Sequence, residues 1–430
     1  MMISTVNLSN ISVGKNNIVG NIAFYSYVFS VVLSPLGPVL HYSLWTICLL
    51  SLLHDCIVNK KSLLICELGH DGKWIFCFFT LLIFWSAIAG LFNYQEINAY
   101  GKNVTMPLEL WFGTYFAMKT LGSGIARERF IKIFLWGSFV ILLGNFLRVI
   151  GLLNNFPNGS LDNGNALGAL GLYLFAPCIS FVFWAPTGSS LKKISILIPV
   201  IGVIFFSFSS GVWLSAFLCG LVFLWYAVKF KKLCARICLI TTISLLVAYL
   251  AANRYTNGEV QNCFLREIQQ ITSVGNVEQL TTQRNEIWNA CFYLTKQRPI
   301  TGWGGQLFYD VYVQLFNTKA HEIGLKKMQD ATHPHSTYFY LAYISGIPGM
   351  VFFLLAMGLG IKKTLALVKL ERDASFPWAL SILLLLIAVL TYGTNGDVFQ
   401  GRRDISVMVW CFLGILIILP EKKNKEHFET

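Results

Sequence analysis

The sequence contains few charged residues. Asp, Glu, Lys and Arg together make up 13% of its 430 residues, whereas soluble domains average about 25%. Hydrophobic residues make up 55% of the chain, so too little polar sequence remains to coat a water-exposed surface. This shortage excludes an ordinary soluble protein and predicts one whose surface contacts lipid.

The chain also lacks the signals of several other classes. Its 11 cysteines show no paired spacing of the kind that binds a metal, and no internal repeat of roughly 20 to 50 residues is visible. The first apolar run follows a long polar start without a small-residue cleavage site, which predicts that no signal peptide is removed. The net charge of +12 comes with no nucleic-acid motif, so nucleic acid is not an expected partner.

Apolar runs recur along nearly the whole chain. A helix needs about 20 predominantly apolar residues to cross a bilayer, and twelve runs meet or approach this length. They are Val19–Leu36, Val39–Val58, Trp74–Leu91, Met106–Leu121, Phe130–Leu153, Leu167–Ala185, Ile194–Phe208, Val212–Val228, Cys234–Ala252, Thr337–Gly360, Phe376–Tyr392 and Ile405–Leu419. Glu109 interrupts the fourth run, and the seventh and eighth are short and close enough to form one helical hairpin.

Basic residues mark alternate breaks between these runs. Loops on the cytoplasmic side of a membrane carry an excess of Lys and Arg, so this alternation predicts that both termini are cytoplasmic. The basic residues in question are Lys60, Lys61, Lys119, Arg127, Arg129, Lys132, Lys192, Lys193, Lys229, Lys231, Lys232, Arg236, Lys362, Lys363, Lys369, Arg372, Lys422, Lys423 and Lys425.

The same alternation places the segment from Asn253 to Pro334 outside the membrane, on the other face. The predicted organisation is therefore nine transmembrane helices in residues 1–252, a large loop in residues 253–334, and three further transmembrane helices with a cytoplasmic tail in residues 335–430. The fold class is all-α, a polytopic membrane protein with about 12 transmembrane helices.

The large loop is predicted to be partly helical. Apolar residues at helical spacing predict a helix over Gln283–Lys296, and Phe308–Phe316 is a second amphipathic stretch. Between them, Pro299 is followed by a turn that contains Gly302, Gly304 and Gly305. The loop also holds Cys263 and Cys291, which we expect to be two free thiols; a disulfide is the alternative if the compartment is oxidising.

The strongest chemical signal lies where this loop meets the next span, in the run from Thr332 to Thr337. It contains His333 and His335, and a histidine at a membrane–water boundary can accept a proton near neutral pH. The plain alternative is a pair of interfacial histidines at the start of a helix, with Ser336 or Thr337 as its N-cap.

Two glycines punctuate the span that follows. Gly346 and Gly349 would let another helix or a ligand approach the backbone closely. The stretch His335-Ser336, nine residues, Gly346, two residues, Gly349 resembles the signature of the O-antigen ligase family, which has His followed by Asn, Ser or Gln, nine residues, Gly, and a small or aromatic residue three further on.

A second run upstream supports this resemblance. Arg284, Trp288 and Ala290, followed by Pro299, Gly302 and Gly304, resemble the Arg…Trp…Ala…Pro…Gly-x-Gly pattern common to the ligases and the related O-antigen polymerases. The resemblance covers about Arg284 to Gly349 in detail.

The resemblance implies a membrane glycosyltransferase of the bacterial inner membrane. O-antigen ligases transfer a polysaccharide from undecaprenyl diphosphate to a sugar hydroxyl of the lipid A core, on the periplasmic face. The expected partners are the undecaprenyl-diphosphate-linked O-antigen, the lipid A-core oligosaccharide and membrane lipids. The resemblance implies no nucleotide, metal or other cofactor.

The matched residues receive roles that make chemical sense. His335 would be the general base on the acceptor hydroxyl, because such a hydroxyl is a poor nucleophile until its proton is accepted. Arg284 would hold the diphosphate, whose growing negative charge a guanidinium stabilises. His333 and Trp288, which stand in the same two runs, are assigned to substrate binding.

Three further arginines are candidates for substrate binding. Arg148 lies near the outer end of a span, where it either lines the site or extends to the interface. Arg402 and Arg403 lie in a short outer loop, where they either bind anionic substrate or are plain surface charges. The remaining basic residues of the large loop are expected to be solvated: Arg254, Arg266, Lys296 and Arg298.

One position departs from the family pattern. Many relatives carry an arginine in a Ser-Arg-Gly-like turn between two middle spans, on the outer face. Here the turn reads Ser209-Ser210-Gly211, with Ser210 in place of the arginine. Arg148, Arg402 or Arg403 is a candidate to replace it.

Two other functions compete with the ligase. An O-antigen polymerase would join lipid-linked repeat units and often has two sizeable outer loops, whereas this chain has one dominant loop. A transporter would show paired broken helices or an internal repeat, and the sequence shows neither.

Overall fold

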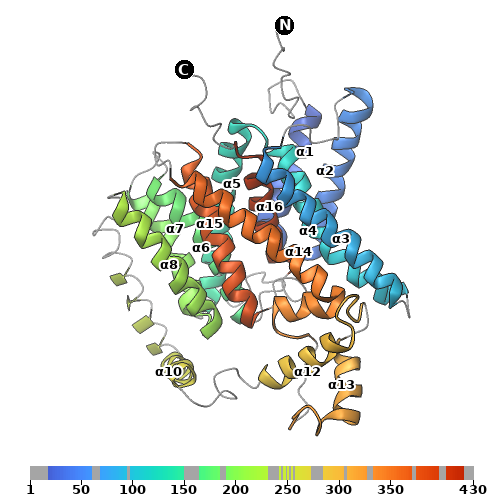
Figure 1. Ribbon diagram of the computed structural model, residues 1–430. Helices are drawn as coiled ribbons and strands as arrows, with labels where there is room; N and C mark the ends of the chain where they lie inside the picture. The colour runs from blue at the N-terminus through green and yellow to red at the C-terminus, as the bar shows by residue number, and fades with distance from the viewer. Residues whose placement is uncertain are drawn as a thin grey trace, which may run out of the picture.

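The computed structural model is helical in all of its regular elements (Figure 1). This holds for the residues that the structure describes, which are 18–60, 68–93, 97–149, 164–184, 190–230, 242–243, 246–247, 249–250, 253–254, 257–272, 284–304, 308–326, 333–369, 374–396 and 403–420. The predicted all-α fold class is confirmed.

The helices follow the predicted apolar runs closely. In chain order they are α1 (Ile18–Leu33), the 3₁₀ helix η1 (Ser34–Leu36), α2 (Pro38–Val58), α3 (His70–Phe92), α4 (Ile97–Thr120), α5 (Gly124–Val149), α6 (Gly164–Trp184), α7 (Ser190–Phe205), α8 (Ser210–Lys229), α10 (Glu259–Thr272), α12 (Arg284–Gln297), α13 (Phe308–Lys319), α14 (Thr337–Leu367), α15 (Phe376–Asn395) and α16 (Arg403–Ile418). Only the ninth run, Cys234–Ala252, falls mostly outside the described residues.

Seven helices in the described residues are long and apolar enough to cross a membrane. They are α1 with η1, α2, α3, α6, α8, α14 and α15, and α7 and α16 are shorter apolar helices. The protein is therefore a polytopic membrane protein. The full count of about twelve crossings stays a prediction, because α4 and α5 carry several charges and the ninth run is not described.

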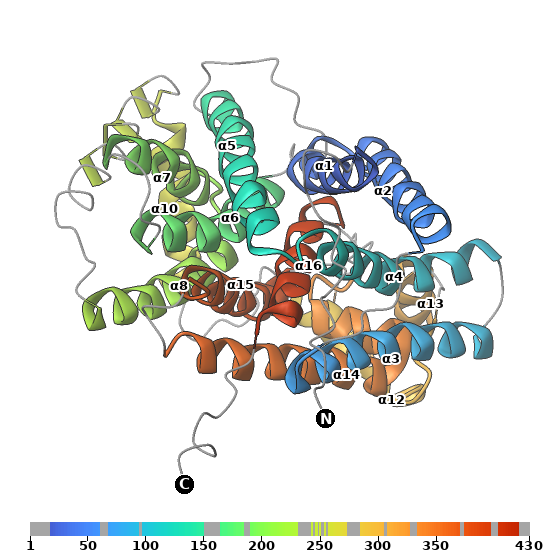
Figure 2. The ribbon, with the colours of Figure 1, turned by 90° about the horizontal axis from the view of Figure 1, so that it is seen from above.

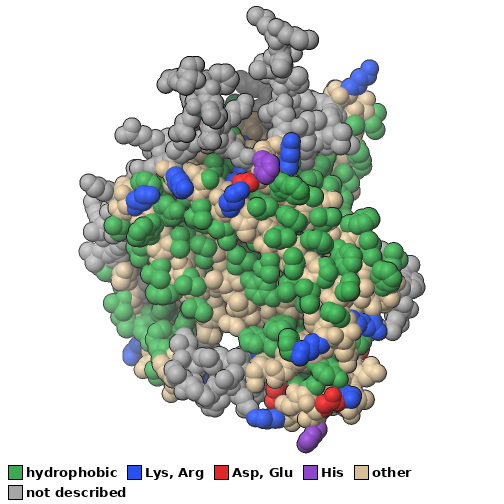
Figure 3. Space-filling model, in the orientation of Figure 1, with side chains coloured by type: hydrophobic (Ala, Val, Ile, Leu, Met, Phe, Trp, Pro, Cys, Tyr) green, Lys and Arg blue, Asp and Glu red, His purple; other side chains and the backbone are tan. Residues whose placement is uncertain are grey.

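The helices form one bundle whose centre lies around α6, α15 and α16. Most side chains of these three helices are buried, whereas α2, α3 and α8 expose large apolar side chains. Seen from above, α16 stands between α4 and α15 (Figure 2). Figure 3 shows apolar side chains over the middle of the molecule and charged side chains toward its two ends. This distribution fits a bundle surrounded by lipid.

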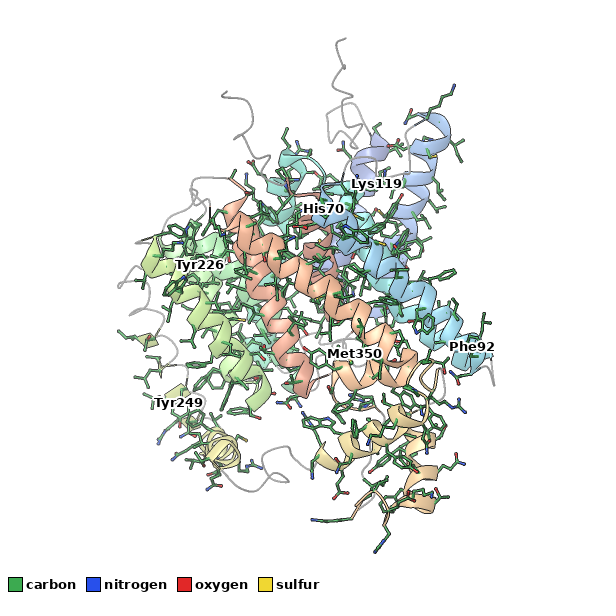
Figure 4. The ribbon with its side chains drawn as sticks, in the orientation of Figure 1. His70, Phe92, Lys119, Tyr226, Tyr249 and Met350 are labelled. Atoms are coloured by element: carbon green, nitrogen blue, oxygen red, sulfur yellow. The ribbon has the colours of Figure 1, made fainter. Side chains whose placement is uncertain are left out.

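Contacts between α3 and α14 show which elements share an end of the bundle. Lys362 of α14 forms an ion pair of 2.9 Å with Asp71 at the start of α3, and His70 lies at the same end as Lys119 (Figure 4). The other end of α3 reaches the loop, because Asn93 Nδ2 donates to the Gly302 carbonyl over 3.0 Å. The loop helices α12 and α13 thus lie opposite the basic end, as the charge alternation predicts.

The predicted hairpin of α7 and α8 exists as a connection rather than as a packed pair. A short turn over Phe206–Ser209 joins the two helices. However, α7 packs mainly against α6 and α5, and α8 packs mainly against α15 and α6. The two helices are therefore separate members of the bundle.

The loop contains the two predicted helices and one that was not predicted. α12 and α13 begin within one residue of the predicted positions. The helix that was not predicted is α10 (Glu259–Thr272). Cys263 in α10 and Cys291 in α12 are both free thiols in the structure.

Candidate active site at the start of α14

His335 has an unusual backbone conformation. Its φ is +53°, in the left-handed region that residues other than glycine seldom occupy. Such a conformation costs roughly 1–3 kcal/mol and persists only where the surrounding structure imposes it. The next residue, Ser336, returns to extended backbone with φ −150° and ψ 129° and is the N-cap residue of α14. The imidazole is thereby presented at the point where the loop enters the helix.

The end of α15 holds this segment. The Ser336 hydroxyl donates to the Gly393 carbonyl over 3.2 Å. Both the backbone N–H and the hydroxyl of Thr337 donate to the Gly396 carbonyl, each over 3.1 Å. The interpretation of Ser336 as the N-cap is thus correct in position, but its side chain makes no capping bond within α14 and bonds across to α15 instead.

Trp288 holds the same segment from the side of α12. Its indole N–H donates to the carbonyl of Pro334 over 3.2 Å, and its ring stacks on Phe339 with centroids 6.1 Å apart. The peptide between the two histidines is therefore fixed. His333 and His335 face each other, with ring centroids 4.1 Å apart and planes inclined by 44°. Of the predicted site residues, these three lie together.

Arg284 reaches the same end of α15. It is the first residue of α12, it is half-buried, and its guanidinium donates to the carbonyl of Asn395. The backbone at a helix C-terminus carries partial negative charge, which favours a cation there. Because Ser336 and Thr337 bond to Gly393 and Gly396, the last turn of α15 links Arg284 to the His335 segment.

The turn that lacks the family arginine lies next to Arg284. A Cβ atom built on Gly211 would lie 3.4 Å from the Cβ of Asn395, so the Ser209–Gly211 turn packs against the residue whose carbonyl accepts from Arg284. Ser210 begins α8 within this turn. Arg284 and the Ser209–Gly211 turn thus both contact Asn395 at the end of α15.

α14 is broken at its tenth residue. Gly346 has a φ of +68° and a ψ of −176°, which is not helical. The backbone of the Pro299–Gly302 turn fills the break: the N–H of Ile347 donates to the Pro299 carbonyl over 2.8 Å, and the N–H of Trp303 donates to the Tyr343 carbonyl over 2.6 Å. The group that approaches Gly346 closely is therefore the loop itself rather than the predicted helix or ligand.

The expectation for Arg298 was wrong. It was expected to be a solvated loop charge, but it is half-buried, its guanidinium donates to the Asn93 side chain, and it lies 4.3 Å over the Trp303 ring. Asn93 in turn donates to Gly302, so Arg298 fastens the turn to α3. The other loop charges, Arg254, Arg266 and Lys296, are exposed as expected.

The three remaining arginines are not joined to this group by the described contacts. Arg148 is half-buried in the last turn of α5, and α5 packs mainly against α7 and α1. Arg402 lies outside the described residues, and Arg403 begins α16 with a side chain that is not described. Their roles in substrate binding stay predictions.

The end of α15 was not among the predicted site residues. The polar run Thr391-Tyr392-Gly393-Thr394-Asn395-Gly396 follows an apolar span and supplies carbonyls that accept hydrogen bonds from Arg284, Ser336 and Thr337. Its composition is unusual for the end of a span and could have marked it. In the described part of the chain, no three His, Cys, Asp or Glu side chains are grouped so as to hold a metal ion.

A bundle of apolar helices, with imidazoles and a guanidinium where the large loop enters the bundle, defines a polytopic membrane protein with a polar site at its edge. Residues 195–354 match the family model described as O-antigen ligase, and this match supports the resemblance to the O-antigen ligase family. The match runs from α7 to the middle of α14 and includes Arg284, His335 and Gly346. A comparison with curated proteins gives no match.

Proposed function

We propose that the protein is an O-antigen ligase that transfers polysaccharide from undecaprenyl diphosphate to the lipid A-core oligosaccharide, on the periplasmic face of the bacterial inner membrane. The observation that carries this proposal is the arrangement at the start of α14. His335 stands there in a strained backbone, and Arg284 meets the same turn of α15 that holds Ser336 and Thr337. The family match over residues 195–354 supports it.

The proposed reaction is a single displacement. The acceptor hydroxyl oxygen forms a bond to the anomeric carbon of the donor while its proton passes to the imidazole of His335. The bond between that carbon and the diphosphate oxygen breaks, and undecaprenyl diphosphate leaves with the electron pair. The imidazolium then loses its proton to water, and no nucleotide or metal takes part.

Arg284 is proposed to stabilise the leaving diphosphate. A guanidinium has five N–H donors, so it can hold the Asn395 carbonyl and also donate to a phosphate oxygen. Its position beside the Ser209–Gly211 turn supports a phosphate site where relatives have two arginines. In this chain the imidazolium of His335, formed as the proton is transferred, would add a second positive charge to that of the Arg284 guanidinium.

The polymerase remains the second candidate, because it uses the same chemistry with a lipid-linked repeat unit as acceptor. One dominant outer loop favours the ligase. A broken helix such as α14 can indicate a transporter, because broken helices of transporters line a substrate site. Here, however, the break at Gly346 is filled by the Pro299–Gly302 backbone, so it gives transport little support.

The test is electrophoresis of lipopolysaccharide from a strain that lacks the gene. A ligase predicts loss of all O-chains, with lipid-linked polymer accumulating, and restoration by the wild-type gene. A single repeat unit on the core would identify a polymerase instead. An unchanged banding pattern would contradict both.

A further inference from the structure

An amphipathic helix crosses the outer end of the bundle. α10 spans Glu259–Thr272, and Figure 1 looks along its axis, whereas α8 lies close to the plane of the picture. α10 is therefore oriented across the spanning helices rather than along them. Its apolar residues Val260, Phe264 and Ile268 follow one another at intervals of four, which places them on one side of the helix.

Part of this apolar side is seated on the tips of two spans. The Phe264 ring lies 5.7 Å from Phe205 at the end of α7 and 5.5 Å from Trp213 in the first turn of α8, between ring centroids. It also lies 6.4 Å from the Tyr249 ring. Val260 is 8% exposed. These contacts fix the depth of α10 at the level where α7 ends and α8 begins.

A tight turn fixes the same depth from the other side. The N–H of Gly258 donates to the Asn253 carbonyl over 2.9 Å, and the N–H of Gln261 donates to the Asn253 side chain over 3.0 Å. The first turn of α10 is thus bonded to Asn253, which precedes it in the chain. Both attachments place the helix at the boundary between the apolar part of the bundle and the loop.

The rest of the apolar side is uncovered. Leu265 is 46% exposed and Ile268 is 37% exposed, and both lie beside the seated residue Phe264. On α8, whose residue Trp213 contacts Phe264, Leu214 and Phe217 are 53% and 61% exposed. α8 is a candidate membrane span, so these two side chains face lipid. α10 is thus seated against a helix that has a lipid-facing surface.

We propose that α10 lies in the interface of the outer leaflet, with Leu265 and Ile268 inserted among phospholipid acyl chains. Arg266 lies on the opposite side of the helix from Ile268 and is exposed, as an interfacial helix requires. The partner is the phospholipid surface itself. This proposal does not depend on the transferase activity.

Such a helix fixes the first part of the large loop at the membrane surface. Through Trp213, α10 borders the start of α8, and Gly211 in that start packs against Asn395. The lipid surface would therefore be held close to the group formed by Arg284, His335 and the end of α15. A lipid whose charged head group lies at the interface would reach these site residues without leaving the bilayer.

The test is photo-crosslinking in native membranes of the full-length protein. Benzoylphenylalanine is introduced at position 265 or 268, and at position 266 as the matched control on the polar side. After irradiation, mass spectrometry of the peptide that contains α10 should show phospholipid adducts from positions 265 and 268, several-fold above the control. Equal adducts at all three positions, adducts with a second copy of the chain, or adducts only with other parts of the same chain would overturn the proposal.

A second measurement does not require the crosslinker. The variant Ile268→Asp should be cleaved faster within the loop by added protease in membranes than the variant Arg266→Asp. The proposal predicts this because charged side chains are costly in the acyl region and would release the helix from the surface. Equal cleavage rates would contradict it, even if transfer activity is absent from all variants.

Discussion

Gly302 and Gly346 meet backbone to backbone at the break in α14. Both have left-handed backbones, with φ of +63° and +68°. A Cβ atom on Gly302 would lie 2.5 Å from the Tyr343 carbonyl oxygen, and one on Gly346 would lie 2.1 Å from that of Ile300. The loop turn and the spanning helix can therefore approach this closely only where neither residue has a side chain.

Gly346→Ala is expected to destabilise the protein by about 2–5 kcal/mol, because the strained φ and the clash with the Ile300 carbonyl add together. The melting temperature of the purified protein measures this loss. Gly358→Ala is the matched control on the same helix, because a Cβ atom there meets nothing within 4 Å. If both variants melt at the same temperature, the result contradicts a close backbone contact at Gly346.

Arg284→Lys is expected to lower the rate of transfer at saturating donor at least tenfold and to leave the protein folded. A lysine keeps the positive charge near the Asn395 carbonyl but cannot reproduce the planar fork that fits a diphosphate. Both kcat and the melting temperature of the variant are measured and compared with those of the wild type. A variant that loses stability and activity in parallel would show that Arg284 only joins α12 to α15.

Glu109 and Tyr42 form a polar pair between α4 and α2. The Tyr42 hydroxyl donates to the Glu109 carboxyl over 2.5 Å, and Glu109 is 9% exposed. Glu109→Leu should destabilise the protein by about 1–3 kcal/mol because the hydroxyl loses its acceptor. Adding Tyr42→Phe should recover part of that loss, with a coupling of about 0.5–2 kcal/mol. Additive losses in the double variant would refute the pair.

Cys263 and Cys291 should differ in reactivity. Cys263 is half-exposed in α10, whereas Cys291 is fully buried in α12, and burial raises the pKa of the Cys291 thiol. Since the thiolate is the reactive form, a membrane-impermeant maleimide added to spheroplasts should label Cys263 and spare Cys291 until the protein is denatured. Failure to label Cys263 would place the loop on the cytoplasmic side, where the proposed reaction has no acceptor.

The sequence predicts the spans well because a bilayer imposes length and apolarity on each helix separately. The periodicity of Ile287 and Cys291 likewise predicts α12, since both face one side of the helix and are buried. The charge of Glu109 weakened the fourth run, yet α4 forms there because Tyr42 supplies the carboxyl with a partner.

Features that depend on tertiary contacts could not be predicted in this way. The bonds from Ser336 and Thr337 to the end of α15 join residues almost 60 positions apart, and no local pattern encodes that pairing. Arg298 was assigned to solvent because its contacts, Asn93 and Trp303, come from a different helix and from a turn. α10 was not predicted because polar residues surround its short apolar stripe. Its residue Phe264 finds its packing partners, Phe205 and Trp213, on two other helices.

The most direct test of the proposed chemistry uses His335 itself. The purified protein is reconstituted in vesicles with undecaprenyl-diphosphate-linked O-antigen and lipid A-core acceptor, and the release of undecaprenyl diphosphate is measured. The wild type should release it only when acceptor is present, and His335→Ala, at equal abundance and melting temperature, should reduce the rate at least a hundredfold, as expected for loss of a general base. A His335→Ala protein that works at the wild-type rate would contradict the account.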